Sequence, residues 1–255
     1  MDTAFWSHWG WPLATAALGY VYVALLMAQW RQRRKPHQLA WALGFLLYAV
    51  AATMEAWSEA AQHWDPTVYR VYIVIAAALV GLLGQGTVYL LFKDRKWGNI
   101  YLAYNLAVTA IFLYGTFTTD LGPLTPGITV GGLPLGASGT FPRFMSMFLT
   151  IPGSVALLGG SAWSVAKFWS KPEYRYRAWA NVLIFIGTLV IAGAGSMART
   201  GQTVGLYPAE MVASAILLAG FLMAGTLEKG AAAVRARLGA ARTKREDADT
   251  PTDRP

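Results

Sequence analysis

Seven stretches of apolar residues, each about 20 residues long or longer, recur along the chain between short polar connections. A helix of about 20 residues can cross a hydrocarbon core of about 30 Å while satisfying its own backbone hydrogen bonds. The pattern therefore predicts an all-α polytopic membrane protein, a bundle of seven transmembrane helices. The spans are expected near residues 11–30, 39–60, 70–92, 99–120, 144–168, 178–199 and 206–228.

The basic residues are distributed unevenly over the predicted connections. Of the 21 Lys and Arg residues, 18 fall on one side of the predicted spans, and only Arg70, Arg143 and Arg199 fall on the other. Cytoplasmic connections of membrane proteins carry the excess of basic residues. We therefore expect the N-terminus outside and the C-terminus in the cytoplasm, an arrangement that requires an odd number of spans.

The composition excludes several classes of protein. Apolar residues make up 55% of the chain and charged residues only 13%, whereas a soluble domain carries about a quarter charged residues. The absence of Cys excludes disulfides, iron–sulfur clusters and thiolate zinc sites. The three His residues lie at predicted interfaces or outside, and the seventh span contains no Lys for a retinal Schiff base. We expect no catalytic residue, no metal and no cofactor, and hence no enzyme.

Two segments differ from the rest of the predicted domain, 1–228. The connection 121–142 is long, uncharged and rich in Gly and Pro, and it is either a flap over the outer mouth or a flexible linker. Beyond the domain, 229–245 is Ala- and Arg-rich at helical spacing, which predicts a basic juxtamembrane helix resting on anionic lipids. Residues 246–255 are polar and acidic and are expected to be disordered.

Charged residues within the spans gather toward the predicted outer half. Glu55 is the deepest, Glu59 lies one turn away on the same helix, and Glu210 lies just inside the seventh span. An ionised group at the bilayer centre costs about 2.5–3.5 kcal/mol, so such groups face a cavity or each other. The pattern predicts a polar outer vestibule that binds a ligand through Glu55, Glu59, Arg70, Arg199 and Glu210. The alternative for four of these is two boundary salt bridges, Glu59–Arg70 and Glu210–Arg199.

A second, sparser set of polar or helix-bending residues lies deeper in the predicted spans. Gln85, Asn105 and Pro152 are candidates to line a path toward the cytoplasm. Interhelical hydrogen bonds explain Gln85 and Asn105 equally well, and that interpretation is favoured. Glycines recur at helix-packing spacing in the third, fifth, sixth and seventh spans, which indicates close helix approach.

These features favour a membrane protein of the bacterial plasma membrane that binds a small or lipid-like ligand, sensor-like and without an output domain of its own. A small 3+1+3 carrier is one alternative, because Lys35-Pro36 before the second span parallels Lys171-Pro172 before the sixth. An accessory subunit of a membrane complex, with a partner membrane protein, is another. The expected partners are bilayer lipids, with anionic lipids at the basic cytoplasmic face, and no nucleic acid.

Overall fold

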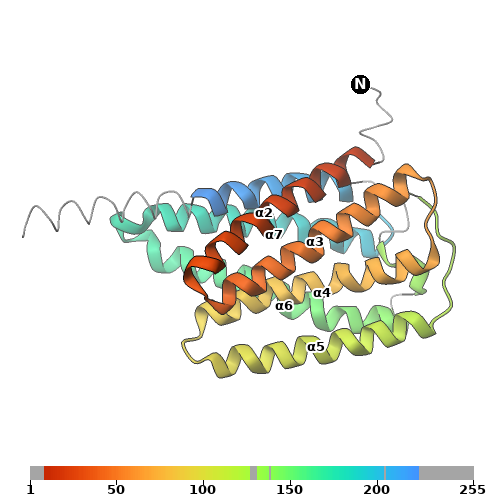
Figure 1. Ribbon diagram of the computed structural model, residues 1–255, viewed down its shortest axis with the longest axis horizontal. Helices are drawn as coiled ribbons and strands as arrows, with labels where there is room; N and C mark the ends of the chain where they lie inside the picture. Colours follow the sequence, from red (N-terminus) through yellow and green to blue (C-terminus); the bar gives the residue numbers. More distant parts are fainter. Residues whose placement is uncertain (1–8, 127–130, 138, 204, 224–255) are drawn as a thin grey trace, which may run out of the picture.

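The computed structural model describes residues 9–126, 131–137, 139–203 and 205–223, and this part of the chain is helical without strands. Seven of its helices are long and apolar enough to cross a membrane, which makes the chain a multi-pass membrane protein. They run nearly side by side along the long axis of the molecule (Figure 1). Their bounds are α2 Trp11–Arg33, α3 Pro36–Ala60, α4 Pro66–Leu91, α5 Arg95–Thr118, α6 Phe141–Trp169, α7 Arg175–Arg199 and the helix Leu206–Met223, which we call the Leu206 helix. The predicted segments 229–245 and 246–255 lie outside the described residues.

Several helices begin three or four residues before the apolar stretch that predicts them. Pro36 and Pro66 stand at the first positions of α3 and α4, where a missing N–H costs nothing. Asp65 caps α4 by accepting hydrogen bonds from the backbone N–H groups of Thr67 (2.8 Å) and Val68 (3.1 Å). Asp94 caps α5 in the same way through Lys96 (2.9 Å). The starts of α4 and α5 are thus set by capping residues rather than by hydropathy.

The cap of α4 makes a testable contribution to stability. The two backbone N–H bonds hold the pKa of Asp65 below its usual range, so the cap stabilises the fold above the pKa of unfolded aspartate, about 3.9, and is lost as the pH falls through the folded value. We expect Asp65→Ala to lower the Tm at pH 7, with a difference from wild type that shrinks toward acidic pH. Asp65→Asn, which keeps an acceptor, should stay close to wild type at pH 7. A deficit in Asp65→Ala that persists unchanged at low pH would contradict this account.

The helices pack mainly on their neighbours in the sequence, and α4 lies at the centre of the bundle. It contacts α3, α5 and α6, while α2 packs on α3 and α7 on α6. The Leu206 helix closes the bundle: hydrogen bonds from Tyr22 on α2 and Tyr48 on α3 reach its backbone, and Gly187 of α7 packs against it. Helix α5 forms one edge of the molecule (Figure 1).

Some of the predicted packing glycines lie where two helix backbones touch. A Cβ on Gly84 of α4 would stand 2.7 Å from the Cα of Gly153 on α6, and the prediction is confirmed at this crossing. Gly19 of α2, which was not among the predicted glycines, also lies at a close crossing, where a Cβ would stand 2.9 Å from the Cβ of Ala49 on α3. The prediction is wrong for Gly159, Gly193 and Gly195, where a Cβ would meet none of the described residues within 4 Å.

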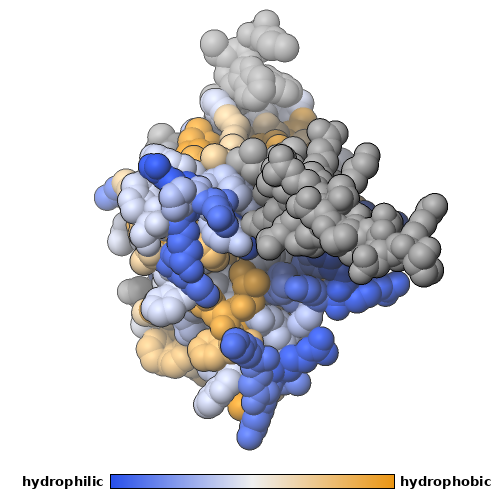
Figure 2. Space-filling view, turned by 90° about the vertical axis from the view of Figure 1, so that its left-hand side faces the viewer, coloured by the Kyte–Doolittle hydropathy of each residue, from blue (hydrophilic) through white to orange (hydrophobic). Residues whose placement is uncertain are grey.

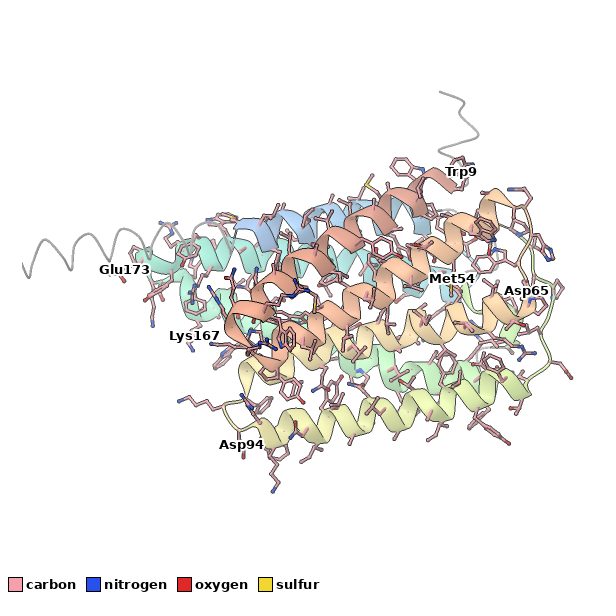
Figure 3. The ribbon with its side chains drawn as sticks, viewed as in Figure 1. Trp9, Met54, Asp65, Asp94, Lys167 and Glu173 are labelled. Atoms are coloured by element: carbon pink, nitrogen blue, oxygen red, sulfur yellow. The ribbon has the colours of Figure 1, made fainter. Side chains whose placement is uncertain are left out.

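Charged side chains lie at both ends of the bundle. Asp94, Lys167 and Glu173 lie at one end and Asp65 at the opposite end (Figure 3). Seen from the end that carries Lys167, strongly hydrophilic side chains surround a smaller apolar patch (Figure 2). Between the ends, apolar side chains such as Leu106 and Val155 are exposed by 61% and 64%, as expected of surfaces that face lipid.

Candidate functional site

The two carboxyl groups of α3 are buried among hydroxyl and indole donors. Glu55 and Glu59 are only 2% and 0% exposed. The hydroxyl of Tyr72 on α4 donates to Oε1 of Glu55 at 2.6 Å. Oε1 of Glu59 accepts from Nε1 of Trp64 at 3.2 Å and from the hydroxyl of Tyr207 at 2.9 Å. The donors thus come from α4, from the Leu206 helix and from the connection between α3 and α4.

Glu210 on the Leu206 helix completes this acidic cluster. Its carboxyl group lies within hydrogen-bonding reach of Glu55. Oε2 of Glu55 is buried and receives no hydrogen bond from a hydroxyl, amide or ring N–H group of the described residues. Two carboxyl groups can hydrogen-bond to each other only when one of them carries a proton. The pair of Glu55 and Glu210 is therefore a place in the bundle where a proton can be held.

The connection before α6 folds over the acidic cluster. The short helix η3, Leu133–Leu135, places Leu135 at 1% exposure in the same apolar cluster as Trp64 and Tyr207. The N–H of Gly122 donates to the carbonyl of Pro134 at 2.8 Å, which ties the two described ends of the connection together. These parts of the connection form a packed cap. Glu55 and Glu59 are buried beneath aromatic side chains of the described residues, and the outward-facing vestibule expected from the sequence stays a prediction.

The two arginines expected beside these glutamates make other hydrogen bonds. Arg70 donates to the carbonyl of Thr116 on α5, and its guanidinium lies 5.8 Å from the ring centre of Phe117. Arg199 donates to the hydroxyl of Thr150 on α6 at 2.7 Å. The structure therefore brings Glu55, Glu59 and Glu210 together and directs Arg70 and Arg199 toward α5 and α6.

The candidates for a polar path form interhelical hydrogen bonds between α4 and α5. Nε2 of Gln85 donates to the carbonyl of Gly98 at 2.7 Å, and Nδ2 of Asn105 donates to Oε1 of Gln85 at 3.2 Å. This geometry matches the favoured interpretation, in which these side chains hold neighbouring helices together by hydrogen bonds. Pro152 lies inside α6, immediately before the crossing of Gly153 with Gly84.

A cavity that the sequence did not reveal lies in the other half of the bundle. It has a volume of about 110 Å³ and is bordered by every described spanning helix except α5. Its walls are mostly aliphatic and aromatic, with a few polar side chains from α6 and α7. The lining residues are Tyr22, Leu26, Trp41, Phe45, Leu83, Thr87, Leu90, Leu91, Leu157, Gly160, Ser161, Ser164, Asn181, Ile184, Thr188, Leu217 and Phe221.

A chain of hydrogen bonds joins the acidic cluster to this cavity. The hydroxyl of Tyr48 donates to the carbonyl of Glu210 at 3.1 Å and lies 2.8 Å from the hydroxyl of Ser214. One turn further along the bundle, the hydroxyl of Tyr22 donates to the carbonyl of Ser214 at 3.3 Å. The ring of Tyr22 stacks on Phe45 at 3.9 Å, and both rings line the cavity. The Leu206 helix thus carries both Glu210 and the cavity residues Leu217 and Phe221.

The described residues contain no cluster of three or more His, Asp or Glu side chains placed to hold a metal ion. Comparison of the chain with protein-family models, with curated proteins and with solved structures finds no match.

Proposed function

We propose that this chain is a membrane-embedded binding protein for a small, largely apolar, lipid-like ligand. The observation that carries the proposal is the cavity of about 110 Å³ bordered by six spanning helices. Ligand sites in helical membrane proteins are built between helices, with apolar walls and a few polar groups that orient the ligand. This cavity has that composition.

The lining residues define the chemistry of the ligand. Ser161 and Ser164 of α6 and Asn181 of α7 contribute hydroxyl and amide groups to the lining, and α3 contributes the rings of Trp41 and Phe45. A ligand with an aliphatic or isoprenoid body and one hydroxyl, carbonyl or carboxyl group suits such walls. Leu90 and Leu91 line the cavity and are 50% and 39% exposed, so the cavity reaches the lipid-facing surface. The ligand would enter from the bilayer rather than from water.

Protonation of the Glu55 and Glu210 pair would control the shape of the binding site. One shared proton keeps α3 and the Leu206 helix together, and its loss leaves two neighbouring negative charges that repel each other. Displacement of Glu210 would move Ser214 and Tyr22 through their hydrogen bonds, and Leu217 with the helix itself. Occupancy of the cavity and protonation of the pair are thereby coupled. The same coupling would serve a carrier, which is the second candidate function.

The distribution of basic residues supports one orientation of this arrangement. With the positive-rich end in the cytoplasm, the N-terminus would be outside, the acidic cluster would lie near the outer face, and the cavity would lie nearer the cytoplasmic face. Anionic lipids would then contact the basic end, and the bacterial plasma membrane is the proposed location.

Photolabelling tests the cavity as the ligand site. The full-length protein in lipid nanodiscs is exposed to a palmitic acid that carries a diazirine, and the labelled peptides are identified by mass spectrometry. We expect labelling of 157–164 and 217–221, reduced several-fold by Leu157→Trp, which fills the cavity. Val155→Trp is the matched control, because Val155 lies on the same helix and is 64% exposed. Equal labelling of the two variants would mean that the probe reports bulk lipid, and the proposal would fail.

Glu55→Gln tests the coupling. Glutamine can still accept from Tyr72, and its amide donates to Glu210 permanently, so the variant mimics the protonated pair. We expect Glu55→Gln to fold, with a Tm close to wild type, and to label in the cavity to the same extent at every pH, whereas wild-type labelling depends on pH. If Glu55→Gln only unfolds the protein in detergent, Glu55 is a structural residue and the coupling is wrong.

A further inference from the structure

Two buried hydroxyl groups of the cavity lining already donate hydrogen bonds to their own helices. The hydroxyl of Ser161 on α6 donates to the carbonyl of Leu157 at 2.8 Å. The hydroxyl of Thr188 on α7 donates to the carbonyl of Ile184, also at 2.8 Å. A hydroxyl group has one O–H donor and two acceptor lone pairs. Each of these side chains can therefore accept a hydrogen bond from a ligand but has no donor left to offer it.

Other polar groups of the lining use their donors in the same way. Nε1 of Trp41 donates to a carbonyl of α4 at 3.0 Å, and the hydroxyl of Tyr22 donates to a carbonyl of the Leu206 helix at 3.3 Å. Nδ2 of Asn181 donates to a carbonyl of its own helix at 2.7 Å, which leaves the amide one further N–H and its oxygen. The lining also includes the hydroxyl groups of Thr87 and Ser164, which can donate as well as accept. A ligand in the cavity thus meets more acceptors than donors.

The cavity lining is also uncharged. Among the described residues, it includes no side chain of Asp, Glu, Lys, Arg or His. An ionised group that enters such a site loses its hydration and gains no ion pair, which is costly in a membrane interior. The polar group of a ligand that is bound here is therefore neutral, which excludes a carboxylate, a phosphate or an ammonium group.

We propose that the ligand of the cavity is a lipid alcohol, with an aliphatic or isoprenoid body and one uncharged hydroxyl group. A hydroxyl group donates one hydrogen bond and accepts others, so it suits a lining in which acceptors outnumber donors. An ester or a ketone can only accept, and a carboxylate carries a charge that the lining does not compensate. This inference rests on the proposed function, because it names the polar group of the ligand for the same cavity.

The test measures how well unlabelled lipids with one common chain displace a photoprobe at pH 7. The full-length protein in lipid nanodiscs is labelled with a hexadecanol that carries a diazirine, and labelling of 157–164 and 217–221 is followed by mass spectrometry. The competitors are hexadecanol, methyl palmitate, which only accepts hydrogen bonds, hexadecyl phosphate, which is anionic, and hexadecane. We expect hexadecanol to displace the probe at a concentration about three- to tenfold lower than methyl palmitate, the effect of one hydrogen bond. Hexadecyl phosphate should compete no better than hexadecane.

Variants that remove acceptors connect this preference to the lining. Ser161→Ala and Thr188→Val each delete one hydroxyl oxygen that bonds only within its own helix, so both should fold with a Tm close to wild type. We expect the double variant to lose the preference for hexadecanol over methyl palmitate. Ser196→Ala is the matched control, because Ser196 makes the same kind of bond on α7 at 2.7 Å, is exposed and lies outside the lining.

The outcomes separate this inference from the proposed function. Equal displacement by hexadecanol and methyl palmitate overturns the inference, and so does a preference that persists in the double variant, while labelling in the cavity still supports a lipid site there. Absence of labelling of 157–164 and 217–221 overturns the proposed function together with the inference.

Discussion

Replacing Trp64 with alanine is expected to lower the free energy of unfolding by about 3–5 kcal/mol, the usual cost of truncating a buried aromatic side chain. Trp64 is 1% exposed, and its ring contacts Tyr72 with the ring centres 5.1 Å apart. Its indole N–H also donates to Glu59. Truncation therefore opens a cavity under the cap and removes a donor from a buried carboxyl group. The measurement is thermal or denaturant unfolding in mild detergent.

Trp57 offers the matched control for this variant. It lies on the last turns of α3 and is 75% exposed, so Trp57→Ala removes the same side chain from a lipid- or solvent-facing position. We expect its unfolding to stay within about 0.5 kcal/mol of wild type. Equal destabilisation by the two alanine variants would show that Trp64 is not a packed element of the acidic cluster.

Gly153→Leu is expected to be the second most damaging change, with a loss of about 3 kcal/mol, at the upper end of the range for overpacking. A Cβ at Gly153 would lie 2.4 Å from the carbonyl oxygen of Val80, which is backbone and cannot move aside as a side chain can. Helix α6 would have to separate from α4. Differential scanning fluorimetry of the purified protein measures the loss.

The control for Gly153→Leu lies on the same helix. A Cβ at Gly159 would meet no atom of the described part of the chain within 4 Å, so Gly159→Leu should fold as well as wild type or slightly better, since leucine favours helix over glycine. If both leucine variants melt alike, the crossing of α4 and α6 does not depend on the contact between their backbones.

The spanning helices could be predicted from the sequence because hydropathy over about 20 residues depends on no tertiary contact. The helix starts could not be predicted in this way. The first turns of α4 and α5 lie outside the apolar stretches, and they are helical because Asp65 and Asp94 cap them and, in α4, because proline suits the first position. The spacing of the glycines in the sequence predicted that helices approach each other closely. Which of them touch a neighbour depends on how each helix is rotated, as the contrast between Gly153 and Gly159 shows.

The candidate site could be predicted only in part. The depth of Glu55 in its span singled it out, and the structure places Glu59 and Glu210 beside it. Its hydroxyl partner, Tyr72, was not foreseen, because tyrosines near helix ends are indistinguishable in sequence from those of the interfacial belt. The cavity gives no sequence signal at all. It is formed by side chains of six helices, each of which has the composition of ordinary helix packing.

Native mass spectrometry of the protein extracted from its own membranes in mild detergent tests the binding function most directly. The account predicts a stoichiometric adduct of lipid-like mass on wild type and on Val155→Trp, and its loss from Leu157→Trp. A bare monomer mass for wild type would contradict the account. So would a mass found only with a second polypeptide attached, which would instead indicate an accessory subunit of a membrane complex.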